Sequence, residues 1–410
     1  NTLGEAPVLS QDLNPQLNVQ SMLALLENEG YFNSRIAVDT VSEERKIRLR
    51  YEVAVERPYV ISSVSWRLDS SQLATYLRQL SAEGSVLLPG DRYTVEKIKA
   101  EKERLAQGLK EKGYYYFEAE HLLSYIDTNF QNYTAAIFMT INRPLPENAG
   151  RPYTLKQIVV KTPFTSFSPM PDSLVKILPL QDGIYIDDSS HKFKPDLFSR
   201  TISFRPGTVY SLSEQNRIQA RLNSLGAFRF IKPQFTQAAA GVGLMNVTYY
   251  MAPYQKRKMQ AEVGGFTRSN SYTGGQVSIQ WSDKNIFKRA ENLAIKATGS
   301  FEVTPNDSLK YNNNWRVGIE PTLTIPKLVV PFSFGQQKAT YAKTVFPLSF
   351  DWVRHQDLYT EKYFHSRYEL IWRDTLKREY RLTPFSLTIS NTANFTNGFE
   401  LRQQADSLLK

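Results

Sequence analysis

The stretch Lys110-Glu111-Lys112-Gly113-Tyr114-Tyr115 ends a helical pattern and opens an extended one. Ile98, Leu105 and Leu109 recur at helical spacing before it. Gly113 then stands where a helix needs a left-handed C-cap residue, and the aromatic residue after it can pack back on the helix end. This order of residues predicts a helix that stops at a glycine of positive φ, followed by a strand.

Two other stretches have the same order of residues, Glu27-Asn28-Glu29-Gly30-Tyr31-Phe32 and Leu222-Asn223-Ser224-Leu225-Gly226-Ala227-Phe228. Each glycine precedes a pair of strand-like runs, which are 36–40 and 47–55, 119–126 and 133–141, and 230–235 and 243–250. Gly30, Gly113 and Gly226 therefore mark an internal repeat, whose unit decides the fold class.

A Pro-Gly turn precedes the second helix in two of the repeats, in the stretches P-G-D-R-Y-T (89–94) and P-G-T-V-Y-S (206–211). Such a turn leads into an N-cap Thr or Ser. Ser211 and Glu214 also have the spacing of a capping box. With opening strands expected at 59–68 and 153–161, the unit has the order β-α-α-β-β.

This order, the glycine-aromatic step and the Pro-Gly-x-x-Tyr turn resemble POTRA domains. The resemblance predicts one unit over 1–57 that lacks its opening strand, a complete unit over 58–143, and a third unit over 152–253. The repeat glycines are 83 residues apart (113 − 30) and then 113 residues apart (226 − 113), so we expect an insert in the third unit near 164–204. The alternative is a generic α+β array with chance similarity at three glycines.

After Pro253 the pattern changes to strict alternation of polar and apolar residues. In the first run, one side of the predicted strand has Lys258, Gln260, Glu262 and Gly264, and these alternate with Met259, Ala261, Val263 and Gly265 on the other side. Further runs continue to Ile389 and predict about seven strands of membrane-spanning length. We therefore predict the N-terminal part of a transmembrane antiparallel β-barrel over 254–410. A soluble sandwich also alternates, but the aromatic ends of the apolar faces (Trp281, Trp315, Trp352 and Trp372) favour a membrane.

The links between these strands alternate in kind, with polar links at 268–272, 303–314 and 355–362 expected at the cell surface. The other links are expected at 283–291 and 374–377. The stretch Trp281-Ser-Asp-Lys-Asn-Ile-Phe287 resembles the turn after the second barrel strand of the BamA/TamA family. The opening Leu3-Gly4-Glu5-Ala6-Pro7-Val8 is similar to the Bacteroidota TamA-like branch. Because the chain starts at Asn1 and the family has a longer barrel, we expect a segment of a longer polypeptide.

The resemblance implies insertion, assembly or translocation of proteins at the bacterial outer membrane, with the POTRA units in the periplasm. Unfolded outer-membrane protein clients, TamB-like or assembly-machine lipoprotein subunits, and outer-membrane lipid are the partners that it implies. The alternatives are a two-partner-secretion transporter and a POTRA-tethered barrel that displays a passenger. A porin-like pore or a periplasmic scaffold would be a different class.

The mechanism expected is β-augmentation, in which the sheet edge of a POTRA unit pairs with an incoming extended strand, and the first strand of the barrel does the same in lipid. The strand Lys258 to Gly265 is the expected seam of the barrel. Gly264 and Gly265 weaken pairing there, as a seam that opens requires. Relief of crowding at a barrel bend is the alternative reason for this glycine pair.

Composition excludes several other classes of protein. The 410 residues include no cysteine, so disulfides and thiolate chemistry are excluded. The net charge is +10, but no run of five Lys or Arg residues occurs, which argues against nucleic-acid binding. The four histidines have no metal-ligand spacing, and no G-x-S-x-G occurs. We therefore predict no enzyme, no cofactor and no metal site.

Overall fold

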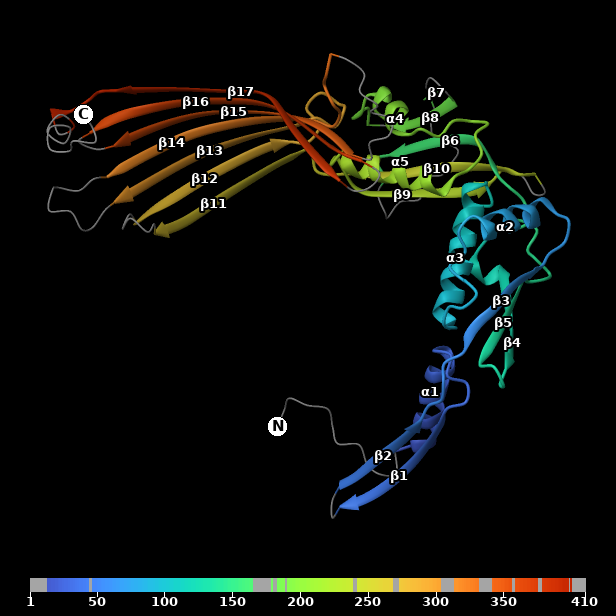
Figure 1. Ribbon diagram of the computed structural model, residues 1–410. Coiled ribbons are helices and arrows are strands. Elements are labelled where there is room, and N and C mark those ends of the chain that lie inside the picture. Colours follow the sequence, from blue (N-terminus) through green and yellow to red (C-terminus); the bar gives the residue numbers. More distant parts are fainter. Residues whose placement is uncertain are drawn as a thin grey trace. The chain divides into compact units, whose positions relative to one another are not determined.

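The computed structural model describes residues 13–43, 46–164, 178–179, 183–188, 190–238, 242–267, 273–303, 313–331, 341–355, 358–374, 378–397 and 399. The opening stretch 3–8 lies outside these residues, as do the predicted link 268–272, most of the predicted link 303–314, and residues 356–357 of the link predicted at 355–362. The strands on either side reach further into that last link than expected, since one ends at His355 and the next begins at Tyr359. The chain divides into two compact units (Figure 1), the first formed by 1–154 with 209–212 and 241–243, the second by the remainder. The predicted division into three repeats and a barrel segment stays a prediction. Below, first, second and third repeat mean residues 13–57, 58–143 and 152–253.

The first repeat contains one helix and a β-hairpin. Its elements are α1 (Pro15–Asn28), β1 (Arg35–Glu43) and β2 (Lys46–Ala54). The Leu17 amide donates to Asn14 Oδ1 (3.1 Å), which caps α1, and Pro15 takes the first helical position. β1 and β2 pair antiparallel along their whole length.

The second repeat has the predicted element order β-α-α-β-β. Its elements are β3 (Val60–Arg67), α2 (Gln72–Ala82), α3 (Val95–Glu111), β4 (Leu122–Asn129) and β5 (Thr134–Ile141). The sheet order is β3-β5-β4, with β3 parallel and β4 antiparallel to the central strand β5. The strand expected from Ala119 begins at Leu122, because Ala119–His121 forms a 3₁₀ turn capped by Glu118 and His121.

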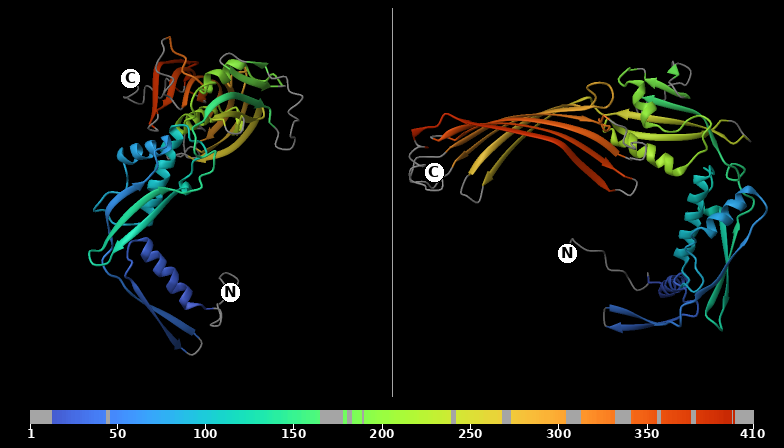
Figure 2. Two further views of the ribbon diagram at one scale, coloured as in Figure 1. Left: turned by 90° about the vertical axis from the view of Figure 1, so that its right-hand side faces the viewer. Right: turned by 45° about the horizontal axis from the view of Figure 1, so that its top comes forward.

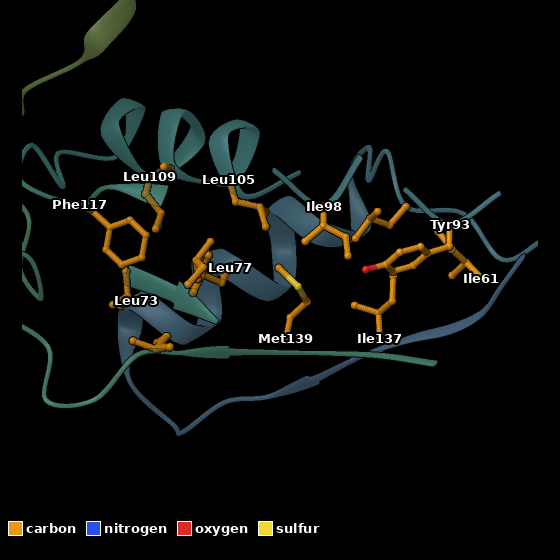
Figure 3. Packing of buried hydrophobic residues seen from close by; sticks show 14 of the residues in the cluster. Ile61, Leu73, Leu77, Tyr93, Ile98, Leu105, Leu109, Phe117, Ile137 and Met139 are labelled. Carbon is orange, nitrogen blue, oxygen red and sulfur yellow. The ribbon is translucent and has the colours of Figure 1, made fainter. Parts of the chain in front are cut away.

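The core of this repeat forms where both helices cover one face of the sheet (Figure 3). The helical pattern that the sequence suggested packs there, since Ile98, Leu105 and Leu109 are buried. Leu77 of α2 and Ile137 of β5 are completely buried against them. Burying a side chain of this kind contributes about 1.5 to 3 kcal/mol.

The third repeat has a larger sheet. Its elements are β6 (Thr154–Thr162), β7 (Leu178–Pro179), β8 (Ile184–Asp188), α4 (Pro195–Thr201), α5 (Leu212–Ser224), β9 (Phe228–Gln237) and β10 (Leu244–Pro253). The order β7-β8-β6-β10-β9 keeps the opening strand β6 beside the last strand β10. The described part of 164–204, where we expect an insert, contains β7, β8 and the short helix α4.

The last part of the chain is an antiparallel seven-stranded sheet whose strands are neighbours in chain order. They are β11 (Arg257–Thr267), β12 (Thr273–Asp283), β13 (Asn292–Val303), β14 (Asn314–Ile325), β15 (Tyr341–His355), β16 (Tyr359–Arg373) and β17 (Glu379–Ala393). The predicted number of strands is confirmed. The sheet is twisted and curved (Figure 2), and its edge strands β11 and β17 do not pair with each other. Within the described part of the chain, no helix combines the length and apolarity needed to cross a membrane.

Candidate functional site at an open sheet edge

β11 contains the whole predicted seam, Lys258 to Gly265, and pairs with β12 on one side. Among the described residues no strand pairs with its other side. In an antiparallel strand every second residue directs its amide and carbonyl away from a given neighbour. About half of the seam's backbone groups therefore point away from β12, and they are chemically able to bind a further strand.

The register between β11 and β12 places polar side chains opposite polar ones. Lys258 stands opposite Ser282, and Glu262 stands opposite Ser278. This face of the sheet is hollowed by a cavity of about 640 Å³. Its polar lining comprises Gln276, Lys296, Thr298, Ser300, Glu302, Arg316, Glu320, Ser349 and Asp351. The hollow face is therefore suited to water.

The opposite face exposes large apolar side chains. Met259 is 70% exposed and Val263 is 81% exposed. Cross-strand pairs such as Ile319 with Phe350 keep the apolar side chains on one face. Its exposed members further along the sheet are Val277, Ile279, Trp315, Val317, Ile319, Leu348, Phe350, Phe364, Leu382, Phe385, Leu387 and Ile389. An apolar face of this extent marks an interaction surface.

The surroundings of Gly264 and Gly265 bear on the two explanations for this glycine pair. A Cβ added at Gly264 would meet no atom within 4 Å, and one at Gly265 would be 3.8 Å from the Gly274 carbonyl oxygen. Gly274, by contrast, would place a Cβ 2.2 Å from the Phe301 carbonyl oxygen. Crowding therefore explains Gly274 and leaves Gly264 and Gly265 without a packing reason.

The base of β11 is held by the turn that follows β12. The Lys284 amide donates to the Lys256 carbonyl oxygen (2.9 Å). The buried carboxylate of Asp283 lies 3.5 Å from Lys256 Nζ and 3.9 Å from Arg257 Nε. Asn285 orders the turn itself, because its Oδ1 accepts from the Ala290 amide (2.8 Å).

This turn also binds the third repeat. Asn285 Nδ2 donates to the Lys192 carbonyl oxygen (2.8 Å), and the Lys194 amide donates to the Lys288 carbonyl oxygen (2.8 Å). Arg289 Nε lies 2.8 Å from Asp196 Oδ2. The resemblance had singled out 281–287, but no local signal in the sequence marked Lys192 or Asp196 as its partners.

Gly30 and Gly113 have roles that the sequence did not reveal. Both have the positive φ that a C-cap requires, at 85° and 97°, which confirms that prediction. The Tyr59 amide donates to the Gly30 carbonyl oxygen and the Tyr153 amide to that of Gly113, both at 2.9 Å. A Cβ at Gly113 would lie 2.8 Å from Val209 Cγ1. These two glycines therefore allow one repeat to approach the opening strand of the next.

Gly226 also has a positive φ, of 65°, but a Cβ there would meet no atom within 4 Å. Its predicted positive φ is confirmed, but its surroundings lack the close approach found at Gly113.

Aromatic side chains complete the contact after Gly113. Tyr115 packs edge-on against Tyr210 with 5.0 Å between ring centroids, and Tyr116 packs in the same way against Tyr153 at 5.3 Å. Burial raises the pKa of Tyr115, with a smaller contribution from Tyr116. These tyrosines are structural. The described residues contain no group of three or more His, Asp or Glu side chains placed to hold a metal ion.

No family model matches the chain, and no curated protein matches it. Solved structures do. The chain is similar to BamA POTRA3-5 of Haemophilus influenzae, at 17% identity over 58% of this chain and 80% of that chain, with a TM-score of 0.35. It is also similar to BamA of Haemophilus ducreyi lacking POTRA domains 1-3, at 11% identity over 82% of this chain and 63% of that chain, with a TM-score of 0.42.

A third match is CdiB of Acinetobacter baumannii, at 10% identity over 92% of this chain and 72% of that chain, with a TM-score of 0.31. The chain thus spans less than two thirds of the Haemophilus ducreyi structure. These three TM-scores are all below 0.5, so the likenesses carry no conclusion about function.

Proposed function

We propose that this chain takes part in the insertion, assembly or translocation of proteins at the bacterial outer membrane, as a protein of the BamA/TamA type. Its three repeats act as periplasmic POTRA units, and β11 to β17 form part of a transmembrane barrel. The observation that carries the proposal is an open edge strand, β11, on a sheet with one polar hollow face and one exposed apolar face.

The two faces suit the two environments of a barrel wall. A row of side chains such as Val263, Ile279 and Phe350 would be costly in water, and lipid is the occupant that matches it in extent and polarity. The opposite face bears charged residues such as Lys296 and Asp351, which suit a water-filled lumen. A soluble sandwich would instead need a second protein layer over the apolar face.

The open edge supplies the means of binding clients. An unfolded outer-membrane protein presents extended segments whose backbone groups lack partners in lipid, where each such group costs several kcal/mol. Pairing with β11 would satisfy them by main-chain hydrogen bonds without bond chemistry. Gly264 and Gly265 keep the pairing weak enough for a client strand to leave. TamB-like or lipoprotein subunits are the expected further partners.

Single-cysteine variants test the lipid-facing side, since the chain has no cysteine of its own. A fluorophore on Ile279→Cys or Ala297→Cys should be quenched by a lipid-borne spin label in membranes of the full-length protein. The matched controls are Ser278→Cys and Thr298→Cys, next along the same strands and on the polar face. Quenching of both sets alike, or of neither, would refute the barrel.

A matched glycine pair tests the seam. Gly265 and Gly299 both have room for a side chain, but Gly265 lies on the edge strand and Gly299 on β13, which is paired on both sides. Relieving a strand of glycine strengthens pairing by about 0.5 to 1 kcal/mol, so Gly265→Val should slow client assembly about two- to fivefold. Gly299→Val should leave the rate unchanged. Equal rates for both variants would contradict a role for the seam.

A further inference from the structure

A cavity of about 510 Å³ lies where the third repeat meets the seven-stranded sheet, inside one compact unit of the chain. Helices α4 and α5 form one wall of this cavity. The turn after β12 and the link between β14 and β15 form the other wall. The described residues that line the cavity include none of β11, so this site is separate from the seam.

The helical wall of the cavity is basic. Arg200 of α4 and Arg221 of α5 line it, and Arg289 reaches it from the turn after β12. Arg200 and Arg289 share the carboxylate of Asp196, at 3.4 Å and 2.8 Å, and both guanidinium groups are partly exposed. A guanidinium group has five N–H donors, so one carboxylate does not saturate two of them. The two arginines can therefore bind a further anion.

The other charges of the cavity add to this preference for an anion. Lys327 is a fourth basic side chain, whereas Glu291 is the one acidic side chain in the lining that the structure describes. The Glu291 carboxylate already accepts from the Arg289 amide (2.9 Å). Burial lowers the pKa of Arg221, although the charge of Glu214 opposes this fall. An anion in the cavity would stabilise the charged form of Arg221.

The opposite wall continues the apolar face of the sheet. Ile325 and Ala342 line the cavity from the ends of β14 and β15. Ile325 lies on the same side of β14 as Ile319, because the two are an even number of residues apart. Ala342 pairs with Trp372, which stacks on Tyr380 with 5.4 Å between ring centroids. Trp and Tyr at the end of an apolar face are typical of the level of the lipid headgroups.

We propose that this cavity binds the headgroup of an anionic phospholipid, with the phosphate on the basic wall and the glycerol and acyl chains along the apolar wall. The inference rests on the proposed function, because the apolar wall adjoins lipid only if β11 to β17 span the membrane. Arginine binds phosphate oxygens through paired N–H groups, and basic pockets beside membrane-spanning elements bind lipid headgroups. The bound lipid would join the third repeat to the barrel wall.

The test uses the full-length protein in phosphatidylcholine nanodiscs that contain a small fraction of phosphatidylglycerol with a photoreactive group on its headgroup. After irradiation, the label should lie on the peptides that contain α4 and α5. A phosphatidylcholine analogue with the same photoreactive group should label these peptides about fivefold less, because its headgroup has no net charge. Equal labelling by the two analogues, or label on the strands of the sheet alone, would overturn the proposal.

A pair of charge variants locates the site. Arg200→Gln combined with Arg221→Gln removes two charges from the basic wall and should reduce labelling by phosphatidylglycerol about tenfold. The matched control, Arg229→Gln combined with Lys232→Gln, removes two charges from β9 of the same repeat, outside the cavity, and should leave labelling unchanged. An equal loss in both variants would contradict the site. The comparison of the two lipid analogues uses the unaltered protein, so it decides the question even if the arginine variant fails to fold.

Competition separates a lipid from a free anion. Unlabelled phosphatidylglycerol should suppress labelling of α4 and α5, whereas inorganic phosphate at the same molar excess should not. Equal suppression by phosphate would show that the cavity binds a free anion and would overturn the lipid as its occupant.

Failure of this proposal is distinguishable from failure of the proposed function. If α4 and α5 stay unlabelled while a fluorophore on Ile279→Cys is quenched in the same nanodiscs, the cavity does not bind lipid and the barrel stands. Loss of quenching at Ile279→Cys would instead refute the barrel.

Discussion

The second and third repeats carry the same Glu-Arg pair in different surroundings, with the glutamate twelve residues and the arginine nine residues before the repeat glycine. Arg104 lies 2.8 Å from Glu101, whose side chain is 1% exposed. Arg217 lies 3.0 Å from Glu214, whose side chain is 22% exposed. The geometry of the pair is thus nearly the same, whereas its burial differs.

The rest of each repeat causes the difference. In the second repeat Glu101 also accepts from the Val86 amide (3.0 Å), and Arg104 donates to the Leu80 carbonyl oxygen (2.9 Å), so the pair ties α3 to the end of α2. In the third repeat Glu214 accepts from the Ser203 hydroxyl, in the segment after the much shorter helix α4. The spacing of the two residues in the helix is enough to form the ion pair, whereas the burial given by the surrounding fold determines how much the pair contributes to stability.

Removing the arginine of each pair should give the largest difference between the repeats. Arg104→Ala leaves a buried carboxylate without its counterion, which should cost about 3 to 5 kcal/mol. Arg217→Ala breaks a more exposed pair and should cost about 0 to 1 kcal/mol. Hydrogen exchange of amides in β5 and β10 would measure the local stability of each repeat in the full chain.

A double variant sharpens this comparison. Glu101→Gln combined with Arg104→Met removes both charges and keeps most of the volume, so it should recover most of the stability lost in Arg104→Ala. If Arg104→Ala and Arg217→Ala cost the same, burial does not distinguish the two pairs and the comparison fails.

The repeat glycines should give the next largest difference. Alanine at either Gly113 or Gly226 adds strain of about 1 kcal/mol at positive φ. At Gly113 the new methyl group also collides with Val209 and Pro152, and crowding of this kind raises the total to about 2 to 4 kcal/mol. Exchange of the Tyr153 amide, which donates to Gly113, should accelerate in Gly113→Ala. A normal rate there would show that the repeats do not need this approach.

The sequence predicted those features that depend on neighbouring residues. The spacing of Ile98, Leu105 and Leu109 predicted the buried face of α3, and Gly113 predicted where this helix ends. The alternation of apolar and polar side chains, as in Val277, Ser278 and Ile279, predicted the strands of the seven-stranded sheet. Periodicity and glycine conformation depend on residues that are close in the chain, so both can be predicted from a single sequence.

The sequence did not predict the contacts between segments that are far apart in the chain. Gly113 was expected to cap a helix, but the need for close approach arises from Pro152 and Val209, far along the chain. Similarly, the turn after β12 was recognised, but its partner Lys192 lies 93 residues away from Asn285. Such pairings follow from tertiary packing, which a single sequence does not encode in any local pattern.

The smallest expected effect is a loss of stability at acid pH, caused by protonation of Glu101 in the buried pair with Arg104. Burial by itself raises the pKa of Glu101, but hydrogen bonds from Arg104 and from the Val86 amide outweigh it, and the pKa lies below its usual value. A carboxyl group with a lowered pKa in the folded state contributes stability that is fully present above the pKa of the unfolded chain, about 4.3. That contribution is lost as the pH falls through the lower, folded pKa.

Hydrogen exchange of β5 amides should therefore show constant stability of the second repeat from pH 7 to about pH 5, with a decline below about pH 4. Glu101→Gln cannot titrate, so it should begin with lower stability at neutral pH and decline less steeply in acid. The difference between the two profiles isolates Glu101 from the other carboxylates of the repeat. Parallel profiles would mean that Glu101 has the same pKa in the folded and unfolded chain, and the buried pair would then contribute no acid-sensitive stability.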